Sequence, residues 1–132
     1  MSDLKKYKIL VADDNKINVK VAEYTLRNFA SQLDFAYNGV EVLEKIDKNT
    51  YDVILMDVKM PVMDGYEATQ IIRSREKENP NLKAIKIIAI TANNQPEEIT
   101  FCMSVGMDDF LAKPFTSVEA FSRIQSLCDS NL

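Results

Sequence analysis

The chain has 132 residues, of which 46% are hydrophobic and 27% charged, and its formal net charge is −4. One ordinary globular domain has this composition, and an acidic chain with no basic stripe argues against direct binding of nucleic acid. No apolar run approaches the roughly 20 residues that span a bilayer, and the N-terminus is not a signal peptide, so we expect a cytoplasmic domain without membrane contact.

Histidine is absent from the sequence. This excludes Ser-His-Asp and Cys-His catalysis, most zinc sites, and any role of this chain as a phosphohistidine donor. The two cysteines, Cys102 and Cys128, are far apart and form no Cys-x-x-Cys pair. We expect free thiols, as in a reducing cytoplasm. Any chemistry must therefore use carboxylates, hydroxyls and lysines.

Five short apolar runs alternate with longer stretches at helical spacing. The runs are Tyr7–Ala12, Leu33–Ala36, Val53–Met56, Ile85–Ile90 and Phe110–Ala112. The first, third and fourth are continuous rather than alternating, which is typical of strands buried on both faces of a parallel sheet. We therefore predict five strands.

Apolar residues at intervals of three or four mark five helices between and after these runs. We expect the inner faces to carry Ile17, Val21, Tyr24 and Leu26; Val40, Leu43 and Ile46; Tyr66, Thr69 and Ile72; Ile99 and Met103; and Val118, Phe121, Ile124 and Leu127. The helix starts have caps: Asp14 or Asn15, then Asn38, Asp64 and Thr116, each of these three followed three residues later by Glu, and Pro96 in the fourth helix. The strict alternation predicts one doubly wound α/β domain over residues 1–132, with no linker or second domain.

Polar side chains follow four of the predicted strands. Asp13 and Asp14 follow the first, Asp57 the third, Thr91 the fourth and Lys113 the fifth. Each has a plain structural explanation alone, as a helix cap, a turn residue or a solvated lysine. Ligands of open parallel sheets bind beyond the carboxyl ends of the strands, so the coincidence of all five at one edge favours a functional site.

Three carboxylates brought together need a compensating charge. Each pair at 4 Å repels by about 4 kcal/mol at a surface-like dielectric constant, so a pKa must rise or a cation must bind. A hard divalent ion with oxygen ligands, Mg²⁺ above all or Mn²⁺, fits this need. The Lys113 ammonium and the Thr91 hydroxyl would then face an anion, such as a phosphoryl group carried by Asp57.

The residues Asp13-Asp14, Asp57-Val-Lys-Met-Pro61, Thr91-Ala92 and Lys113-Pro114 resemble the full signature of the response-regulator receiver family, over essentially the whole chain. The resemblance implies a flavodoxin-like (CheY-like) fold with five parallel strands in the order 2-1-3-4-5. It also implies that Asp57 accepts a phosphoryl group from a phosphohistidine. Mg²⁺ would be bound by Asp14, Asp57 and the backbone carbonyl of Lys59, with Asp13 acting through water.

Further roles follow from the same resemblance. Thr91 and Lys113 would hold the phosphoryl oxygens, while Lys59 and Asn93 would flank the attacking water and tune the phosphoryl lifetime. Phe110 would be the aromatic switch that turns inward on phosphorylation, although a plain core aromatic is the alternative. We also expect the Lys113–Pro114 bond to be cis, an isomer that costs X-Pro only about 0.5–1 kcal/mol.

The family's partners are sensor histidine kinases and histidine phosphotransfer domains, and its members are phosphoacceptors rather than enzymes. Asp14-Asn15-Lys-Ile-Asn18 and the stretch from Met56 to Thr69 look like the variant typical of hybrid histidine kinases. We therefore favour a receiver excised from such a kinase over a free-standing single-domain regulator. A phosphotransfer domain would dock beside the first helix, near Asn15, Lys16 and Ile17.

The face formed by the fourth helix, last strand and fifth helix is the expected output surface, with Met103, Met107 and Phe121 as candidates, and a weak homodimer through this face is left open. The main alternative function is an Asp-nucleophile phosphohydrolase, which needs a second Asp where this chain has Lys59. A nucleotide- or flavin-binding module is disfavoured by the lack of a Gly-rich phosphate loop, with only three glycines in the chain. An inactive receiver-like domain would have lost one of the site residues.

Overall fold

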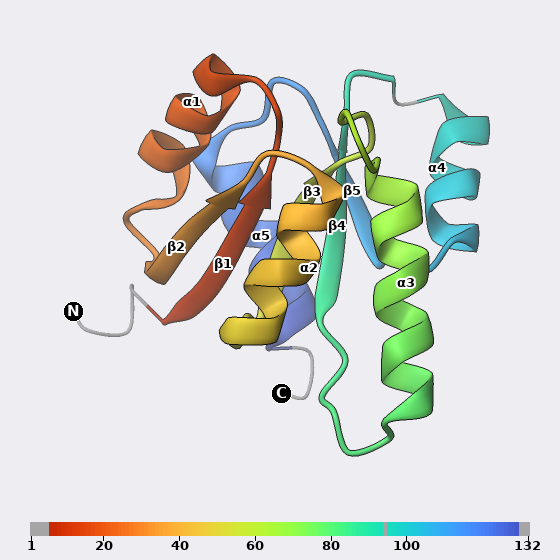
Figure 1. The fold of residues 1–132 in the computed structure, drawn as a ribbon. Helices are drawn as coiled ribbons and strands as arrows, with labels where there is room; N and C mark the ends of the chain where they lie inside the picture. Colours follow the sequence, from red (N-terminus) through yellow and green to blue (C-terminus); the bar gives the residue numbers. More distant parts are fainter. Residues whose placement is uncertain (1–5, 94, 130–132) are drawn as a thin grey trace.

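The computed structural model describes residues 6–93 and 95–129, and it contains the five strands and five helices expected from the sequence (Figure 1). In chain order they are β1 Tyr7–Ala12, α1 Lys16–Leu26, β2 Ala30–Ala36, α2 Gly39–Lys48, β3 Val53–Asp57, α3 Gly65–Glu78, β4 Lys86–Thr91, α4 Pro96–Ser104, β5 Asp109–Ala112 and α5 Ser117–Cys128. The predicted strand positions are confirmed, although β2 begins three residues before the predicted run.

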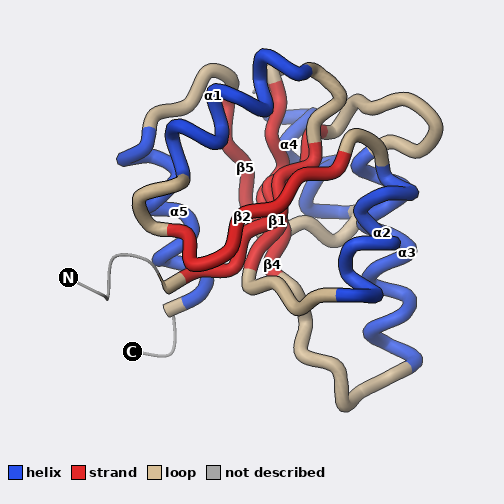
Figure 2. The backbone as a smooth tube through the Cα atoms, turned by 60° about the vertical axis from the view of Figure 1, so that its left-hand side comes forward, coloured by secondary structure: helices blue, strands red, loops and turns tan. Residues whose placement is uncertain are grey.

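The five strands form one parallel sheet in the order β2-β1-β3-β4-β5. Helices α1 and α5 cover one face, and α2, α3 and α4 cover the other (Figure 2). The predicted flavodoxin-like fold is confirmed. The pairing of Ala12 with Met56, and of Asp57 with Ile90, brings the carboxyl ends of β1, β3 and β4 to the same edge.

The continuous apolar runs supply side chains to both faces of the sheet. Leu10, Ile54 and Ile87 belong to the core cluster under α2, α3 and α4, while Ile9 and Ile88 belong to the cluster under α1 and α5. All five are 0% exposed. This explains why β1, β3 and β4 show no alternation of polar and apolar residues.

The helix starts are capped as predicted. The Asn15 side chain accepts the backbone N–H groups of Ile17 and Asn18, so Asn15 rather than Asp14 caps α1. Side chains of Asn38, Asp64 and Thr116 accept the N–H groups of Glu41, Glu67 and Glu119, and Pro96 lies in the first turn of α4. These hydrogen bonds determine the residue at which α1, α2, α3 and α5 begin, close to the edge of the sheet that carries the polar residues.

The predicted inner face of α1 is wrong for three of its four residues, since Ile17, Val21 and Tyr24 are 73%, 52% and 70% exposed. Leu26 is buried as predicted, and Val19, Ala22 and Thr25 are buried with it. The helix carries apolar side chains on two of its faces, so spacing alone could not tell which one meets the sheet. Val118, at 77% exposed, also lies outside the core, and Met107 is buried rather than available on the output face.

Candidate functional site

Asp57 ends the central strand β3 at the edge where the loops converge, and it is only 6% exposed. Its Oδ2 accepts a hydrogen bond from Lys113 Nζ at 2.7 Å, and its Oδ1 accepts the Lys59 backbone N–H at 3.1 Å. The Gly65 backbone lies directly behind it, because a Cβ there would be 2.3 Å from the Asp57 carbonyl oxygen. The Asp57 carboxylate is therefore held through both of its oxygens.

Asp13 and Asp14 bring two further carboxylates to Asp57. One oxygen from each of the three lies within 4.8 Å of the others. Asp13 is buried, accepts the Asn15 backbone N–H at 2.9 Å, and lies 3.4 Å from Lys113 Nζ, whereas Asp14 is exposed. The convergence predicted from the strand ends is thus present, with Asp14 on the side that faces solvent.

Lys113 lies between β5 and α5 and is tied to β4, since its backbone N–H donates to the Thr91 carbonyl at 2.9 Å. The Lys113–Pro114 bond is cis, as expected from the sequence. Thr91 ends β4 and is buried, and its hydroxyl exchanges hydrogen bonds with the backbone of Asn93. The two residues expected to hold an anion therefore stand side by side.

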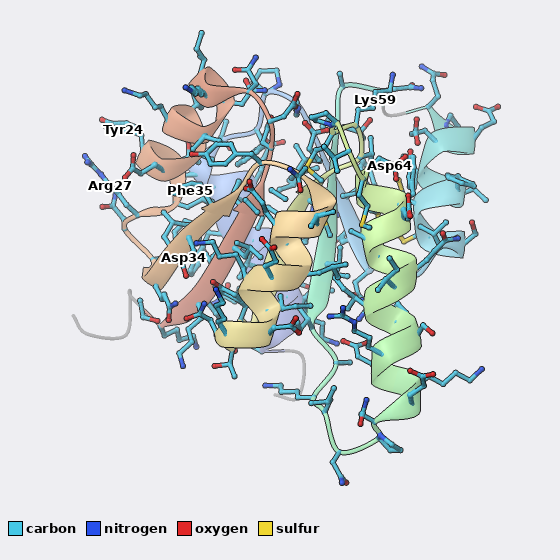
Figure 3. The ribbon with its side chains drawn as sticks, viewed as in Figure 1. Tyr24, Arg27, Asp34, Phe35, Lys59 and Asp64 are labelled. Carbon is cyan, nitrogen blue, oxygen red and sulfur yellow. The ribbon has the colours of Figure 1, made fainter. Side chains whose placement is uncertain are left out.

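A small cavity of about 150 Å³ lies over Asp57. It is lined by Asp57, Val58, Lys59, Thr91, Ala92, Asn93 and Lys113. Lys59 lies at this edge of the sheet, in the loop that leads from β3 to Asp64 and α3 (Figure 3). The cavity thus has a carboxylate, an ammonium and a hydroxyl on its walls.

The pKa values of the central pair reflect this crowding. Burial raises the pKa of the Asp57 carboxyl, although the bonds from Lys113 and the Lys59 N–H act in the opposite direction. Burial alone would lower the pKa of the Lys113 ammonium, but its bond to Asp57 and the charges of Asp57 and Asp13 outweigh this and raise it. Lys113 therefore stays charged, and its ammonium is paired with the carboxylates of Asp57 and Asp13, at 2.7 and 3.4 Å.

The donor set fits a hard divalent cation. Three carboxylates offer oxygen ligands to one point, and Mg²⁺ prefers a few carboxylate oxygens while keeping other positions for water and phosphate oxygens. Histidine is absent from the sequence, and among the described residues the group consists of aspartates alone. The chemistry of the site therefore agrees with the ion expected from the sequence.

Phe110 and Gly65 are not part of this group of carboxylates and Lys113. Phe110 on β5 is half-buried against the core, and the Arg123 guanidinium lies 5.4 Å from its ring centroid while bonding Asp109. Phe110 does not line the cavity over Asp57. Gly65 was missed as a site residue because the pattern that begins at Asp64 indicated only a helix cap.

A doubly wound sheet with these groups at its carboxyl ends defines the class of receiver domains of two-component signalling. The chain belongs to the response regulator receiver domain family, which matches residues 9–125. It is 46% identical over 114 residues to hybrid signal transduction histidine kinase B of Dictyostelium discoideum, and 38% identical over 138 residues to histidine kinase 5 of Arabidopsis thaliana. These alignments cover 81% and 88% of this chain but only 6% and 15% of the relatives.

Solved structures give the same family. The receiver domain of Saccharomyces cerevisiae Ssk1, crystallised with the histidine phosphotransfer protein Ypd1, has a TM-score of 0.89 and 27% identity, covering 97% of this chain and 92% of that one. The receiver domain of the sensor histidine kinase PA1611 of Pseudomonas aeruginosa, with magnesium in its active-site cleft, has a TM-score of 0.79 and 35% identity, covering 93% and 98%. Among the described residues, none of the helices is long and apolar enough to cross a membrane.

Proposed function

We propose that this domain accepts a phosphoryl group on Asp57 from a phosphohistidine of another domain, in a reaction that depends on Mg²⁺ or Mn²⁺. The observation that carries the proposal is the Asp57 carboxylate under a small cavity, 2.7 Å from Lys113 Nζ and grouped with the carboxylates of Asp13 and Asp14. In the transfer, a carboxylate oxygen of Asp57 bonds to phosphorus as the bond from phosphorus to the donor's imidazole nitrogen breaks.

Each neighbour has a role in this proposal. Asp14, Asp57 and the Lys59 carbonyl would hold the divalent ion, with Asp13 acting through water, and the bound ion supplies neutralising charge to the phosphoryl oxygens. Lys113 and the Thr91 hydroxyl would hold the remaining oxygens. The positive charge of Lys113 is in place before the phosphoryl group arrives, because two carboxylates hold the ammonium at 2.7 and 3.4 Å.

Lys59 and Asn93 stand on the rim of the same cavity, where they would tune access of water to the acyl phosphate. We propose that Phe110 reports the phosphorylated state together with Thr91, since β5 and β4 pair at Ala89 and Phe110. The output would be read on the face of α4, β5 and α5, where Val118 of α5 is 77% exposed and lines a surface cavity together with Asp109 of β5. A weak homodimer would use the same face.

The matched relatives suggest what kind of protein this domain comes from and what donates its phosphoryl group. Because the matched relatives include hybrid signal transduction histidine kinase B of Dictyostelium discoideum, we propose that this domain is the receiver part of a hybrid histidine kinase, and that it is a phosphoacceptor rather than an enzyme itself. The donor would be a sensor histidine kinase or a histidine phosphotransfer domain, as the pairing of the Ssk1 receiver with Ypd1 suggests. A cytoplasmic location agrees with two free cysteines. The phosphohydrolase alternative is disfavoured because Lys59 cannot act as a general acid and base for water.

Incubation with acetyl phosphate and Mg²⁺, followed by intact mass measurement, tests the acceptor. The wild-type chain should gain one phosphoryl group, and Asp57→Asn should gain none, because an amide is not a nucleophile of this kind. Asp47→Asn, an exposed acid at the end of α2, is the control and should label like the wild type. Undiminished labelling of Asp57→Asn would overturn the assignment.

A further inference from the structure

Helix α4 is the least deeply packed of the five helices. Among the described residues it buries one, Cys102, whereas α1 and α3 each bury four, α2 three and α5 two. The side chain of its N-cap residue, Gln95, makes no cap hydrogen bond, unlike those of the other four caps. Because little apolar area fixes α4 on the sheet, individual contacts with its neighbours contribute a large share of its stability.

Tyr66, in the first turn of α3, supplies two such contacts. Its hydroxyl donates a hydrogen bond to Oε2 of Glu98, in the first turn of α4. Its ring packs edge-on against Phe101 of α4, with the centroids 4.7 Å apart and the planes at 76°. Figure 1 shows α3 and α4 as neighbours on one face of the sheet. We call Tyr66, Glu98 and Phe101 the α3–α4 latch.

The α3 side of the latch is fixed to the phosphoacceptor strand. Gly65 directly precedes Tyr66, and its N–H donates to the Val58 carbonyl at 3.2 Å. A Cβ on Gly65 would lie 2.3 Å from the Asp57 carbonyl oxygen, so the first turn of α3 is in close contact with the end of β3. When the latch opens, α4 is therefore the element that moves.

A chain of hydrogen bonds links Thr91 to the start of α4. The Thr91 hydroxyl accepts the Asn93 N–H at 3.0 Å and donates to the Asn93 carbonyl at 3.1 Å. Asn93 Oδ1 in turn accepts the N–H of Gln95, the N-cap of α4, at 3.1 Å. A hydroxyl has one hydrogen to donate, so Thr91 can donate to a phosphoryl oxygen only by giving up its bond to the Asn93 carbonyl. The segment that enters α4 would then have to adjust.

Resting on the phosphoacceptor function proposed above, we infer that Tyr66 is a positioning residue that holds α4 in the unphosphorylated arrangement through the α3–α4 latch. The latch is closed here while the Thr91 hydroxyl is bonded to Asn93. A contact made in one of two states favours that state by the free energy of the contact. Loss of the latch should therefore raise the fraction of molecules that are ready to accept the phosphoryl group.

Three substitutions test the latch. Tyr66→Phe removes the hydroxyl and keeps the ring, Glu98→Ala removes the acceptor, and Glu98→Gln keeps a side-chain carbonyl that can accept the same bond. Tyr51→Phe is the matched control, because Tyr51 also donates to a carboxylate, that of Asp34 at 2.6 Å, but lies before β3, at the opposite end of that strand from Asp57. The initial rate of Asp57 labelling is measured with sub-saturating acetyl phosphate and Mg²⁺, and hydrogen exchange of the α4 amides is measured without acetyl phosphate.

Tyr66→Phe and Glu98→Ala should label about three- to tenfold faster than the wild type, and their α4 amides should exchange faster by a similar factor. Glu98→Gln should stay within about twofold of the wild type. The double variant of Tyr66→Phe and Glu98→Ala should be no faster than either single variant, because both remove the same hydrogen bond. Tyr51→Phe should change neither quantity.

Labelling at the wild-type rate or slower by both Tyr66→Phe and Glu98→Ala would overturn the inference. Equal acceleration by Tyr51→Phe would also overturn it, because that result would indicate a general effect of lower stability. A wild-type chain that acetyl phosphate does not label at Asp57 would instead contradict the phosphoacceptor function.

Discussion

Asp14→Asn should stabilise the protein in the absence of a divalent ion, because it removes one of three crowded carboxylates. Asp14 is the exposed member of the group, within 4.8 Å of an oxygen of Asp13 and of Asp57. At that separation each pair repels by about 3.5 kcal/mol for an effective dielectric constant near 20 and by about 0.9 kcal/mol for bulk water. The exposure of Asp14 favours the lower value, which gives about 2 kcal/mol for its two pairs.

Two effects oppose this gain. Lys113 neutralises part of the field of Asp13 and Asp57, and a carboxylate near the N-terminus of α1 interacts favourably with the helix dipole by about 0.5 kcal/mol. We therefore expect Asp14→Asn to raise the free energy of unfolding by about 1 kcal/mol in EDTA. Urea denaturation at low ionic strength measures this change, and salt should reduce it.

Adding Mg²⁺ should make the wild type more stable to unfolding than Asp14→Asn. An ion that binds the folded wild type alone stabilises it by about 2.7 kcal/mol at one hundred times its dissociation constant, and the variant that lacks a ligand should gain much less. Glu44→Gln, at an exposed position of α2, is the control and should behave like the wild type in both buffers. A variant that is less stable than the wild type in EDTA, or that gains as much from Mg²⁺, would refute the reasoning.

Two further predictions concern the close packing of Gly65 against Asp57 and the hydrogen bond between Tyr51 and Asp34 of β2. Gly65→Ala should cost about 1–3 kcal/mol in urea denaturation and slow labelling of Asp57, because the new Cβ would lie 2.3 Å from the Asp57 carbonyl oxygen; a fully stable variant would contradict the close approach. Tyr51→Phe removes the 2.6 Å hydrogen bond to Asp34, which lowers the pKa of that carboxyl, and should cost about 1.5 kcal/mol at neutral pH. Because a lowered pKa stabilises the fold only while the carboxyl is ionised, the difference should close as the pH falls below about 4, and a difference that is independent of pH would argue against the bond.

The sequence was sufficient to predict the sheet and most of the site. Three continuous apolar runs can be buried only between two layers of helices, and parallel strands bring the residues after β1, β3, β4 and β5 to one edge whatever their exact register. Lys113 therefore forms a hydrogen bond with Asp57 at this edge, as expected, although the two residues are 56 positions apart in the sequence. The caps at Asn38, Asp64 and Thr116 were predictable because they depend on neighbours three residues away.

Features that depend on tertiary contacts could not be predicted in this way. Helix α1 has two apolar faces, and only packing against the sheet decides that Ala22 is buried and Val21 is not. The start of β2 was missed because Ala30-Ser-Gln lacks an apolar run at the edge of the sheet. Likewise, no local pattern shows that Arg73 donates hydrogen bonds to the carbonyls of Ile85 and Gly106. These bonds tie α3 to the residue before β4 and to the connection between α4 and β5.

Chemical mapping of the phosphorylated residue tests the central claim most directly. Wild-type chain phosphorylated by a histidine phosphotransfer domain in Mg²⁺ is reduced with borohydride, which converts the acyl phosphate of the acceptor aspartate to homoserine, and its peptides are then sequenced by mass spectrometry. The account predicts homoserine at position 57 alone, and none when EDTA replaces Mg²⁺. Homoserine at position 13 or 14, or reduction at Asp57 that is unchanged in EDTA, would contradict it.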